Sequence, residues 1–228
     1  MKIKKIPVCM MTYERADYFH KSIQSLLRTD LFGAEIIVFD DCSKEFNKLE
    51  KLNYYRLKGI KIIVNKAQRQ TKRMFRKMLK YALDNYDTDC IIIVQDDIVY
   101  NKQWLNKLLE IKDKVPNLGI LTPWDRRCEL MSNKEGWIYR NLEGNKHKCT
   151  IGGVCWLVTK SFALEILKMK RIGGNQYDSA YQKTCSHKGY NIASTVPSYV
   201  QHFGATRMVR KVKERKKFPT AGNFIGEK

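Results

Sequence analysis

The chain has 228 residues, of which 43% are hydrophobic, so it can bury a sizeable core and is not compositionally disordered. Its 43 Lys and Arg residues outnumber its 23 Asp and Glu residues, which gives a net charge of +20. That excess favours a polyanionic partner such as nucleic acid, an anionic membrane surface or an acidic polysaccharide. No stretch approaches the roughly 20 apolar residues that a transmembrane helix needs, and the apolar run after the basic N-terminus is too short for a signal peptide.

Cysteine and histidine usage narrows the class further. Seven cysteines form no C-x-x-C pair, so the sequence indicates neither a disulfide framework nor a zinc ribbon. We therefore expect reduced thiols in a cytoplasmic compartment. The four scattered histidines do not predict a His-based zinc cluster.

The first half of the chain alternates short apolar runs with longer helical patterns. We predict strands at 6–11, 35–39, 60–64, 91–94 and 118–122, and helices at 16–27, 69–83 and 102–111. Continuous apolar strands separated by helices are typical of a mostly parallel sheet covered by helices on both faces. We therefore predict one α/β domain over residues 1–206.

The second half is less regular. It predicts antiparallel strands at 135–140 and 151–158, helices at 161–169 and 175–188, and a final strand at 196–200. Residues 207–228 form a separate basic tail in this interpretation. The sequence contains no internal repeat and no low-complexity block.

Polar residues follow three of the predicted strands directly. They are the segment 12–15, the pair Asp40-Asp41 and the pair Asp96-Asp97. Ligands of parallel α/β sheets bind outside the carboxyl ends of the strands, and carboxylates there can hold a hard divalent cation through oxygen ligands. The competing interpretation is that each Asp pair only caps a helix or stabilises a turn.

The order of these motifs resembles GT-A-type glycosyltransferases, and most closely the family 2 group of nucleotide-diphospho-sugar transferases. The resemblance rests on segments 7–15, 23–27, 36–43 and 94–97, and continues more loosely through 151–156, 177–178 and 202–204. It implies the GT-A fold, which is Rossmann-like, and transfer of a sugar from a nucleotide-sugar donor.

The resemblance also implies roles in donor binding. Residues at the end of the first strand would pack on the nucleotide base, and an Asp after the second strand would bind the uracil imide, which makes UDP the expected nucleotide. An Arg at the start of the next helix would reach the base or the phosphates. These positions are Thr12, Tyr13 and Arg15 for the base, Asp41 with Asp40 for uracil, Arg69 for the Arg, and Asp96 for ribose or sugar.

A divalent cation, Mn²⁺ or Mg²⁺, is implied at the last Asp of the family's Asp-x-Asp signature, which is Asp97 here. The first position of that signature is Gln95, so one carboxylate is missing. His202 resembles the C-terminal metal-binding His of several GT-A branches and would supply the further ligand. The alternative for His202 is an ordinary hydrogen-bonded histidine.

The acceptor side is implied by the looser matches. Asp178 corresponds to the carboxylate that deprotonates the acceptor hydroxyl in inverting members. Its alternative role is a helix N-cap or a first-turn acid. Gly152, Gly153 and Trp156 resemble an acceptor-facing loop, although a glycine turn into a buried strand fits the same residues.

Two segments rich in Lys and Arg bear on the identity of the acceptor. Residues 66–80 hold seven positive charges and no acid, and residues 207–217 hold seven more with one Glu. A solvated face is the usual explanation for such a run. A diphosphate needs only one or two cations, so we expect the runs to bind nucleic acid, with these candidates: Lys72, Arg73, Arg76, Lys77, Arg207, Arg210, Lys211 and Lys213.

The preferred acceptor is therefore double-stranded DNA carrying hydroxymethylated pyrimidines, the substrate of phage-type base-modifying glycosyltransferases. Two alternatives stay open. One is a glycosyltransferase for surface polysaccharide or lipid-linked glycan, with the basic tail on anionic lipid. The other is a non-catalytic nucleic-acid-binding module that has kept the GT-A shell.

Overall fold

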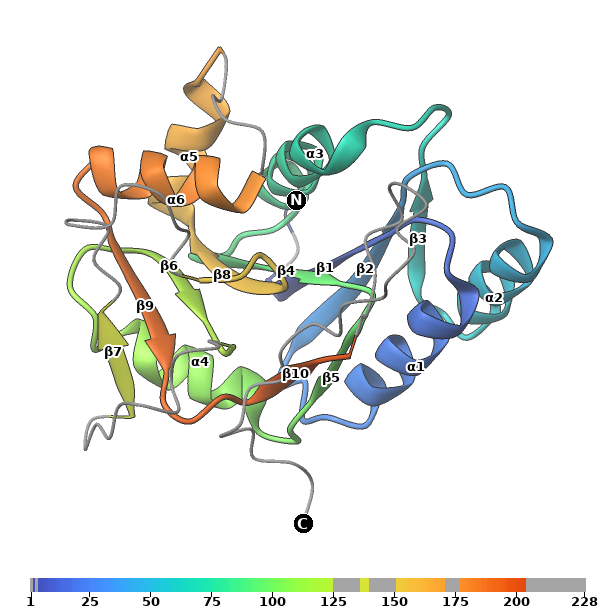
Figure 1. Ribbon diagram of the computed structural model, residues 1–228, viewed down its shortest axis with the longest axis horizontal. Coiled ribbons are helices and arrows are strands. Elements are labelled where there is room, and N and C mark those ends of the chain that lie inside the picture. The colour runs from blue at the N-terminus through green and yellow to red at the C-terminus, as the bar shows by residue number, and fades with distance from the viewer. Residues whose placement is uncertain (1, 3, 125–135, 140–150, 171–176, 204–228) are drawn as a thin grey trace, which may run out of the picture.

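The central sheet dominates the computed structural model, which describes residues 2, 4–124, 136–139, 151–170 and 177–203. Among these residues, the sheet has eight strands in the order β3-β2-β1-β4-β8-β6-β9-β7 (Figure 1). Their bounds are β1 Ile6–Thr12, β2 Ala34–Asp40, β3 Lys61–Val64, β4 Cys90–Gln95, β6 Leu118–Thr122, β7 Trp137–Tyr139, β8 Cys155–Thr159 and β9 Asn191–Thr195.

Most of the sheet is parallel, as predicted. Strands β3, β2, β1 and β4 pair in parallel, and so do β6 and β9. Strand β8 is antiparallel to both β4 and β6, and β7 is antiparallel to β9. All of the strands that run in the common direction therefore end at the same edge of the sheet.

Helices cover both faces of this sheet. Helices α1 (Ala16–Leu27), α2 (Phe46–Leu57) and α4 (Trp104–Lys112) pack with one core cluster, and α3 (Gln70–Asn85), α5 (Lys160–Lys168) and α6 (Tyr177–His187) pack with the other. Neighbouring strand residues alternate between the clusters, as Val8 and Cys9 do in β1. This two-sided burial explains why the strands are continuously apolar. The α/β single-domain fold class is confirmed.

A second, two-stranded sheet lies beside the first and was not predicted. Strand β5 (Ile98–Tyr100) pairs antiparallel with β10 (Val200–His202), and His202 is opposite Ile98. Figure 1 shows this small sheet below the end of β4. It brings two segments about 100 positions apart together directly after the Asp96-Asp97 pair.

Two strand predictions were wrong. Residues 196–199 are not a strand, because Pro197 lacks an N–H to donate and divides β9 from β10. Residues 151–154 form a turn, and β8 begins only at Cys155. Helix α2 was missed altogether, because it buries only Lys48, Leu52 and Tyr55 and shows little apolar periodicity.

Three further expectations meet the structure only in part. The described cysteines, which are Cys9, Cys42, Cys90, Cys155 and Cys185, are all free thiols. No described helix has the length and apolar character needed to span a bilayer. The proposed basic tail and the strand residues 135 and 140 lie outside the described part of the chain.

Candidate active site

The loop after β1 sets the direction of Arg15. Glu14 and Arg15 both adopt the left-handed conformation, with φ of 48° and 51°, which turns the chain sharply before α1 begins. The Glu14 carboxylate accepts hydrogen bonds from the backbone N–H groups of Lys44 (2.7 Å) and Glu45 (3.1 Å) at the start of α2. Glu14 therefore fixes this loop against α2, and Arg15 extends toward the end of β4.

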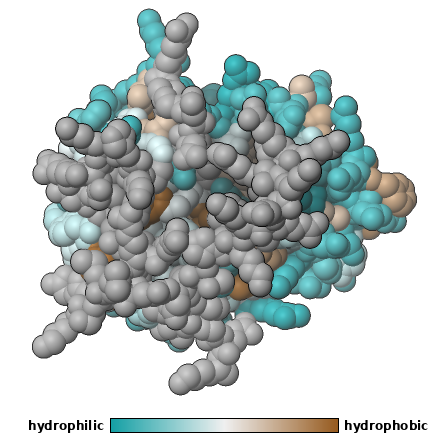
Figure 2. Space-filling view, in the orientation of Figure 1, coloured by the Kyte–Doolittle hydropathy of each residue, from teal (hydrophilic) through white to brown (hydrophobic). Residues whose placement is uncertain are grey.

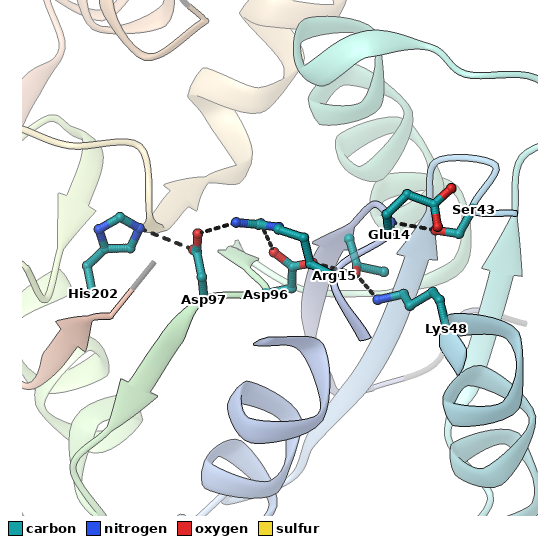
Figure 3. Close-up of polar contacts among 8 residues, drawn as sticks. Glu14, Arg15, Ser43, Lys48, Asp96, Asp97 and His202 are labelled. Carbon is teal, nitrogen blue, oxygen red and sulfur yellow. Dashed lines mark hydrogen bonds and ion pairs between the residues drawn. The ribbon is translucent and has the colours of Figure 1, made fainter. Parts of the chain in front are cut away.

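Arg15 bridges the two carboxylates that follow β4. Its guanidinium donates to Asp97 Oδ2 at 2.8 Å and also to Asp96 Oδ1 (Figure 3). Thr12 Oγ1 donates to the other oxygen of Asp96 at 2.5 Å. Parallel pairing of β1 with β4 places these groups together, as the sequence predicted for residues at adjacent strand ends.

His202 approaches Asp97 from the small sheet. The backbone N–H of Phe203 donates to the carbonyl of Asp97 at 3.0 Å, which extends the β5–β10 ladder to the acid itself. His202 Nε2 then lies 3.3 Å from Asp97 Oδ1, and both side chains are buried. Although His202 is this close, Oδ1 accepts no well-formed hydrogen bond within the described residues.

The two carboxylates differ in their electrostatic environment. Complete burial raises the pKa of Asp96, although Arg15 and Lys48 act against the rise. Burial also disfavours the charged form of Asp97, but contacts with His202 and Arg15 outweigh it and hold the pKa below its ordinary value. The surroundings therefore favour the ionised form more strongly for Asp97 than for Asp96.

A buried lysine supports the same cluster and was not expected from the sequence. The Lys48 ammonium donates to Thr12 Oγ1 and lies 3.7 Å from the centre of the Phe19 ring. The side chain is fully buried, and this burial lowers the pKa of Lys48 to about 8. Lys48 and Arg15 together place two positive groups around Asp96 (Figure 3).

Aromatic side chains surround the Arg15–His202 cluster. Tyr18 stacks on Phe203 with ring centroids 5.6 Å apart, and the Arg15 guanidinium lies 5.4 Å from the Tyr18 ring. On the other side, the Trp124 ring meets His202 edge-on at 6.1 Å. Sequence analysis missed Tyr18, Trp124 and Phe203. Phe203 directly follows His202, which is the one signal that could have found it.

The pair Asp40-Asp41 has a different environment. Asp40 is fully buried, and its two oxygens accept from the Ser43 hydroxyl (2.5 Å) and backbone N–H (2.8 Å). This corrects the prediction that Asp40 binds the nucleotide, because the structure uses it to fix the turn after β2.

Asp41 stands at the N-terminal end of α3. Its Oδ1 accepts from the Asn65 amide and the Arg69 backbone N–H, both at 2.8 Å, and its Oδ2 accepts from the Gln70 backbone N–H at 3.1 Å. A carboxylate has about four lone-pair positions, so Oδ2 keeps one for a ligand. Asp41 therefore has the capping role that was its alternative, and its role in binding uracil stays a prediction.

The remaining donor candidates lie near these loops. Tyr13 is half-buried beside Glu14, and the Arg69 side chain is exposed at the start of α3. Among the acceptor candidates, Trp156 is only 1% exposed and packs against Phe75 with ring centroids 5.6 Å apart. Its indole N–H donates to the Gly152 carbonyl at 2.8 Å. The prediction that the Trp156 indole covers an acceptor sugar is corrected, because the ring belongs to the core.

The structure also describes the other acceptor candidates, which are Gly152, Gly153 and Asp178. A side chain at Gly152 would collide with the Trp124 ring, so only glycine fits where this turn meets the His202 neighbourhood. Gly153 follows in the same turn. Asp178 lies in the first turn of α6, half-buried, and accepts from the Ser179 backbone N–H at 2.8 Å.

The basic candidates on α3 fall into two groups. Arg76 donates to the carbonyls of Met169 (2.7 Å) and Leu167 (3.0 Å), and Lys77 donates to Asn65 Oδ1. Arg73 is exposed, and Lys72 is half-buried with its carbonyl bound to the Tyr181 hydroxyl at 3.1 Å. The candidates of the tail, Arg207, Arg210, Lys211 and Lys213, lie outside the described residues.

The α/β sheet and the acid pair after β4 agree with the family that the sequence resembles. The sequence model of glycosyl transferase family 2 matches residues 8–164, which is more than half of the chain, so the chain belongs to this family.

Solved structures agree on the fold. A mannosyltransferase from Pyrobaculum calidifontis, PcManGT, solved with GDP-Man and Mn²⁺, matches with a TM-score of 0.61 at 13% identity over 86% of this chain. Residues 1–349 of TarS from S. aureus match with a TM-score of 0.60 at 15% identity over 86% of this chain, and TarS 1–349 has also been solved with UDP-GlcNAc. The matches cover 58% and 59% of those chains, so this chain spans about three fifths of their length.

Proposed function

We propose that this chain transfers a glycosyl group from a nucleoside diphosphate sugar to an acceptor hydroxyl, with a divalent cation at Asp97. The observation that carries the proposal is the buried pair Asp97 Oδ1 and His202 Nε2, which lie 3.3 Å apart just after β4. A carboxylate oxygen and an imidazole nitrogen this close together can both bind one divalent cation. Membership of glycosyl transferase family 2 supports the reaction class.

The donor set fits a cation that also binds substrate. The described residues contain no cluster of three or more His, Cys, Asp or Glu side chains suited to a metal. Asp97 Oδ1 and His202 Nε2 would therefore hold the ion together with water and donor phosphates, the pattern typical of Mg²⁺ and Mn²⁺ at diphosphate sites. An imidazole ligand favours Mn²⁺ over Mg²⁺. When bound, the cation would neutralise charge on the departing diphosphate.

The chain's own residues prepare this position. Arg15 fixes the carboxylates of Asp96 and Asp97, so that Asp97 Oδ1 remains directed at His202. Thr12 and Lys48 hold Asp96 from the other side, beside the place where ribose or sugar would bind. The remaining lone-pair position on Asp41 Oδ2 can accept the N–H of a uracil imide, which supports UDP as the nucleotide. Arg69, the residue before α3, would bind the donor phosphates.

For the acceptor we propose double-stranded DNA carrying hydroxymethylated pyrimidines, with Asp178 as the base that takes the proton of the attacking hydroxyl. The support for DNA is the net charge of +20 and the exposed basic face of α3. A target base would be rotated out of the duplex to reach an enclosed site.

The test incubates the full chain with Mn²⁺ and a panel of UDP- and GDP-sugars, together with hydroxymethylated DNA, unmodified DNA or a neutral oligosaccharide. Digestion and mass spectrometry then measure the mass of each nucleoside. We expect a hexose or pentose mass increase on the hydroxymethylated base only. Asp178→Asn should reduce the rate about 100-fold or more without changing donor binding.

Two other outcomes would replace this proposal. Transfer to the neutral oligosaccharide alone would favour a glycan-building enzyme. Failure of UDP with Mn²⁺ to raise the melting temperature, together with retention of DNA, would favour a nucleic-acid-binding module without catalysis.

A further inference from the structure

A basic hollow lies on the face of the molecule that carries α3. Its volume is about 550 Å³, and it is lined by five cations, no acid and one apolar residue: Arg69, Arg73, Arg76, Lys77, Lys80 and Leu167. In Figure 2, hydrophilic residues are visible at the top of the molecule, near the place of α3 in Figure 1, with some apolar residues beside them. The hollow extends from the Asp41 end of α3 to the carboxyl end of α5.

The spacing of the cations follows from the helix. Intervals of four, three, one and three residues from Arg69 to Lys80 keep all five side chains on one face. At 1.5 Å per residue this stripe is about 17 Å long. One strand of a DNA duplex carries one phosphate per about 3.4 Å of axis, so five phosphates occupy a similar length.

Two of the cations are fixed in place by the protein. Arg76 is held by two backbone carbonyls at the end of α5, where a positive charge is also favourable for the helix dipole. Lys77 is held by Asn65 Oδ1. Since a guanidinium has five N–H donors, Arg76 retains donors for a ligand after both of these bonds.

Among the described residues, two of the other three cations have no partner, and the third has one exposed acid. The side chains of Arg69 and Arg73 form no hydrogen bond or ion pair with any described residue, and Lys80 pairs only with exposed Asp84 at 2.9 Å. Burial, and after it the charge of Arg69, lower the pKa of Lys77, while Asp41 acts against this. A cluster of uncompensated cations gains free energy when an anion binds it.

We propose that this hollow, from Arg69 to Lys80 along α3, binds the phosphodiester backbone of duplex DNA and so positions the acceptor for the Asp97 site. The inference rests on the proposed DNA acceptor and names the surface that would hold it. A straight stripe inside a hollow fits a linear polyanion better than a flat bilayer, and its lining offers only Leu167 for insertion into lipid.

The test uses a double variant, Arg73→Ala with Lys80→Ala, because neither side chain contacts Asp97 or holds α5. The matched control is Arg56→Ala with Lys58→Ala, which removes one Arg and one Lys from the end of α2 and leaves the same net charge. Fluorescence anisotropy with a 20-base-pair duplex measures the Kd across a salt series. We expect the R73A/K80A variant to weaken binding about tenfold and to lower the slope of log Kd against log salt by about 1.8, since each phosphate contact contributes about 0.9.

The same proteins are tested for UDP with Mn²⁺ by thermal shift and for binding to anionic phospholipid vesicles. If R73A/K80A and R56A/K58A lose the same amount of DNA affinity, the hollow is not the DNA site. The transferase proposal would still stand in that case, provided that UDP with Mn²⁺ still raises the melting temperature. If R73A/K80A loses vesicle binding but keeps DNA binding, the proposal that the hollow binds DNA is also wrong. If UDP with Mn²⁺ does not raise the melting temperature but R73A/K80A binds DNA more weakly as expected, the transferase proposal is refuted and the hollow remains a DNA-binding surface.

Discussion

Two pairs of adjacent aspartates lie at the ends of buried parallel strands in this molecule, and their carboxylates have different kinds of partner. Asp40 and Asp41 follow β2, and their oxygens accept hydrogen bonds from Ser43, Asn65 and backbone N–H groups. Asp96 and Asp97 follow β4, where the partners are the side chains of Arg15, Thr12 and His202. Backbone N–H partners make the first pair part of the fold, whereas side-chain cations leave the second pair open to exchange with a ligand.

The first prediction separates the pairs by catalysis and has the largest expected effect. Asp97→Asn removes the charge of the oxygen that faces His202, and we expect transfer to fall by about 10³-fold, as for loss of a preorganised electrostatic contact. The free energy of unfolding should also fall, by about 2 kcal/mol, because Asn removes the negative charge that Arg15 and His202 contact. Steady-state kinetics and urea denaturation measure the two quantities. Near-normal transfer would refute the role of Asp97.

For the pair after β2 the quantity to measure is stability. Asp41→Ala leaves the Asn65 amide and the N–H groups of Arg69 and Gln70 without their acceptor, which should reduce the free energy of unfolding by about 3 kcal/mol. Urea denaturation measures this loss, and an unchanged m-value shows that the change is one of stability. Asp41→Asn is the matched control, since it retains one acceptor oxygen and should lose less. Equal midpoints for wild type and Asp41→Ala would show that Asp41 does not stabilise α3.

The sequence predicted that both pairs lie at strand ends, because continuous apolar runs reveal parallel strands and parallel strands share a carboxyl edge. It could not predict their partners. His202 reaches Asp97 through β5 and β10, which are three residues each and pair across about 100 positions, so neither has a periodic signal of its own.

The burial of particular side chains was equally hidden. Trp156 resembled an acceptor-facing residue, yet it alternates into the core between β8 neighbours as any strand residue can. Lys48 lies in α2, a helix without a clear apolar stripe, and a lysine is almost never expected to be fully buried. Only the three-dimensional contacts of Thr12, Asp96 and Phe19 explain its position.

Lys48 gives the last test, because it is the positive group that distinguishes the environment of Asp96 from that of Asp41. Its pKa of about 8 in the folded chain lies below the ordinary 10.5, so the unfolded chain binds more protons between these values and stability rises with pH through that window. Lys48→Met removes this titration. The free energy of unfolding of the wild type relative to Lys48→Met should therefore be constant below about pH 8 and rise by about 2 kcal/mol by pH 10, at 1.36 kcal/mol per pKa unit.

Urea denaturation at intervals from pH 7 to pH 10 measures this difference, in which all titrations common to both proteins cancel. Lys58→Met, at the exposed end of the same helix, supplies the change that follows from removing a surface lysine. A difference between wild type and Lys48→Met that stays flat across the window would show that Lys48 keeps its proton in the folded chain. Lys48 would then stay charged above pH 8 as well, and Asp96 would face two positive groups, Lys48 and Arg15, across the whole window.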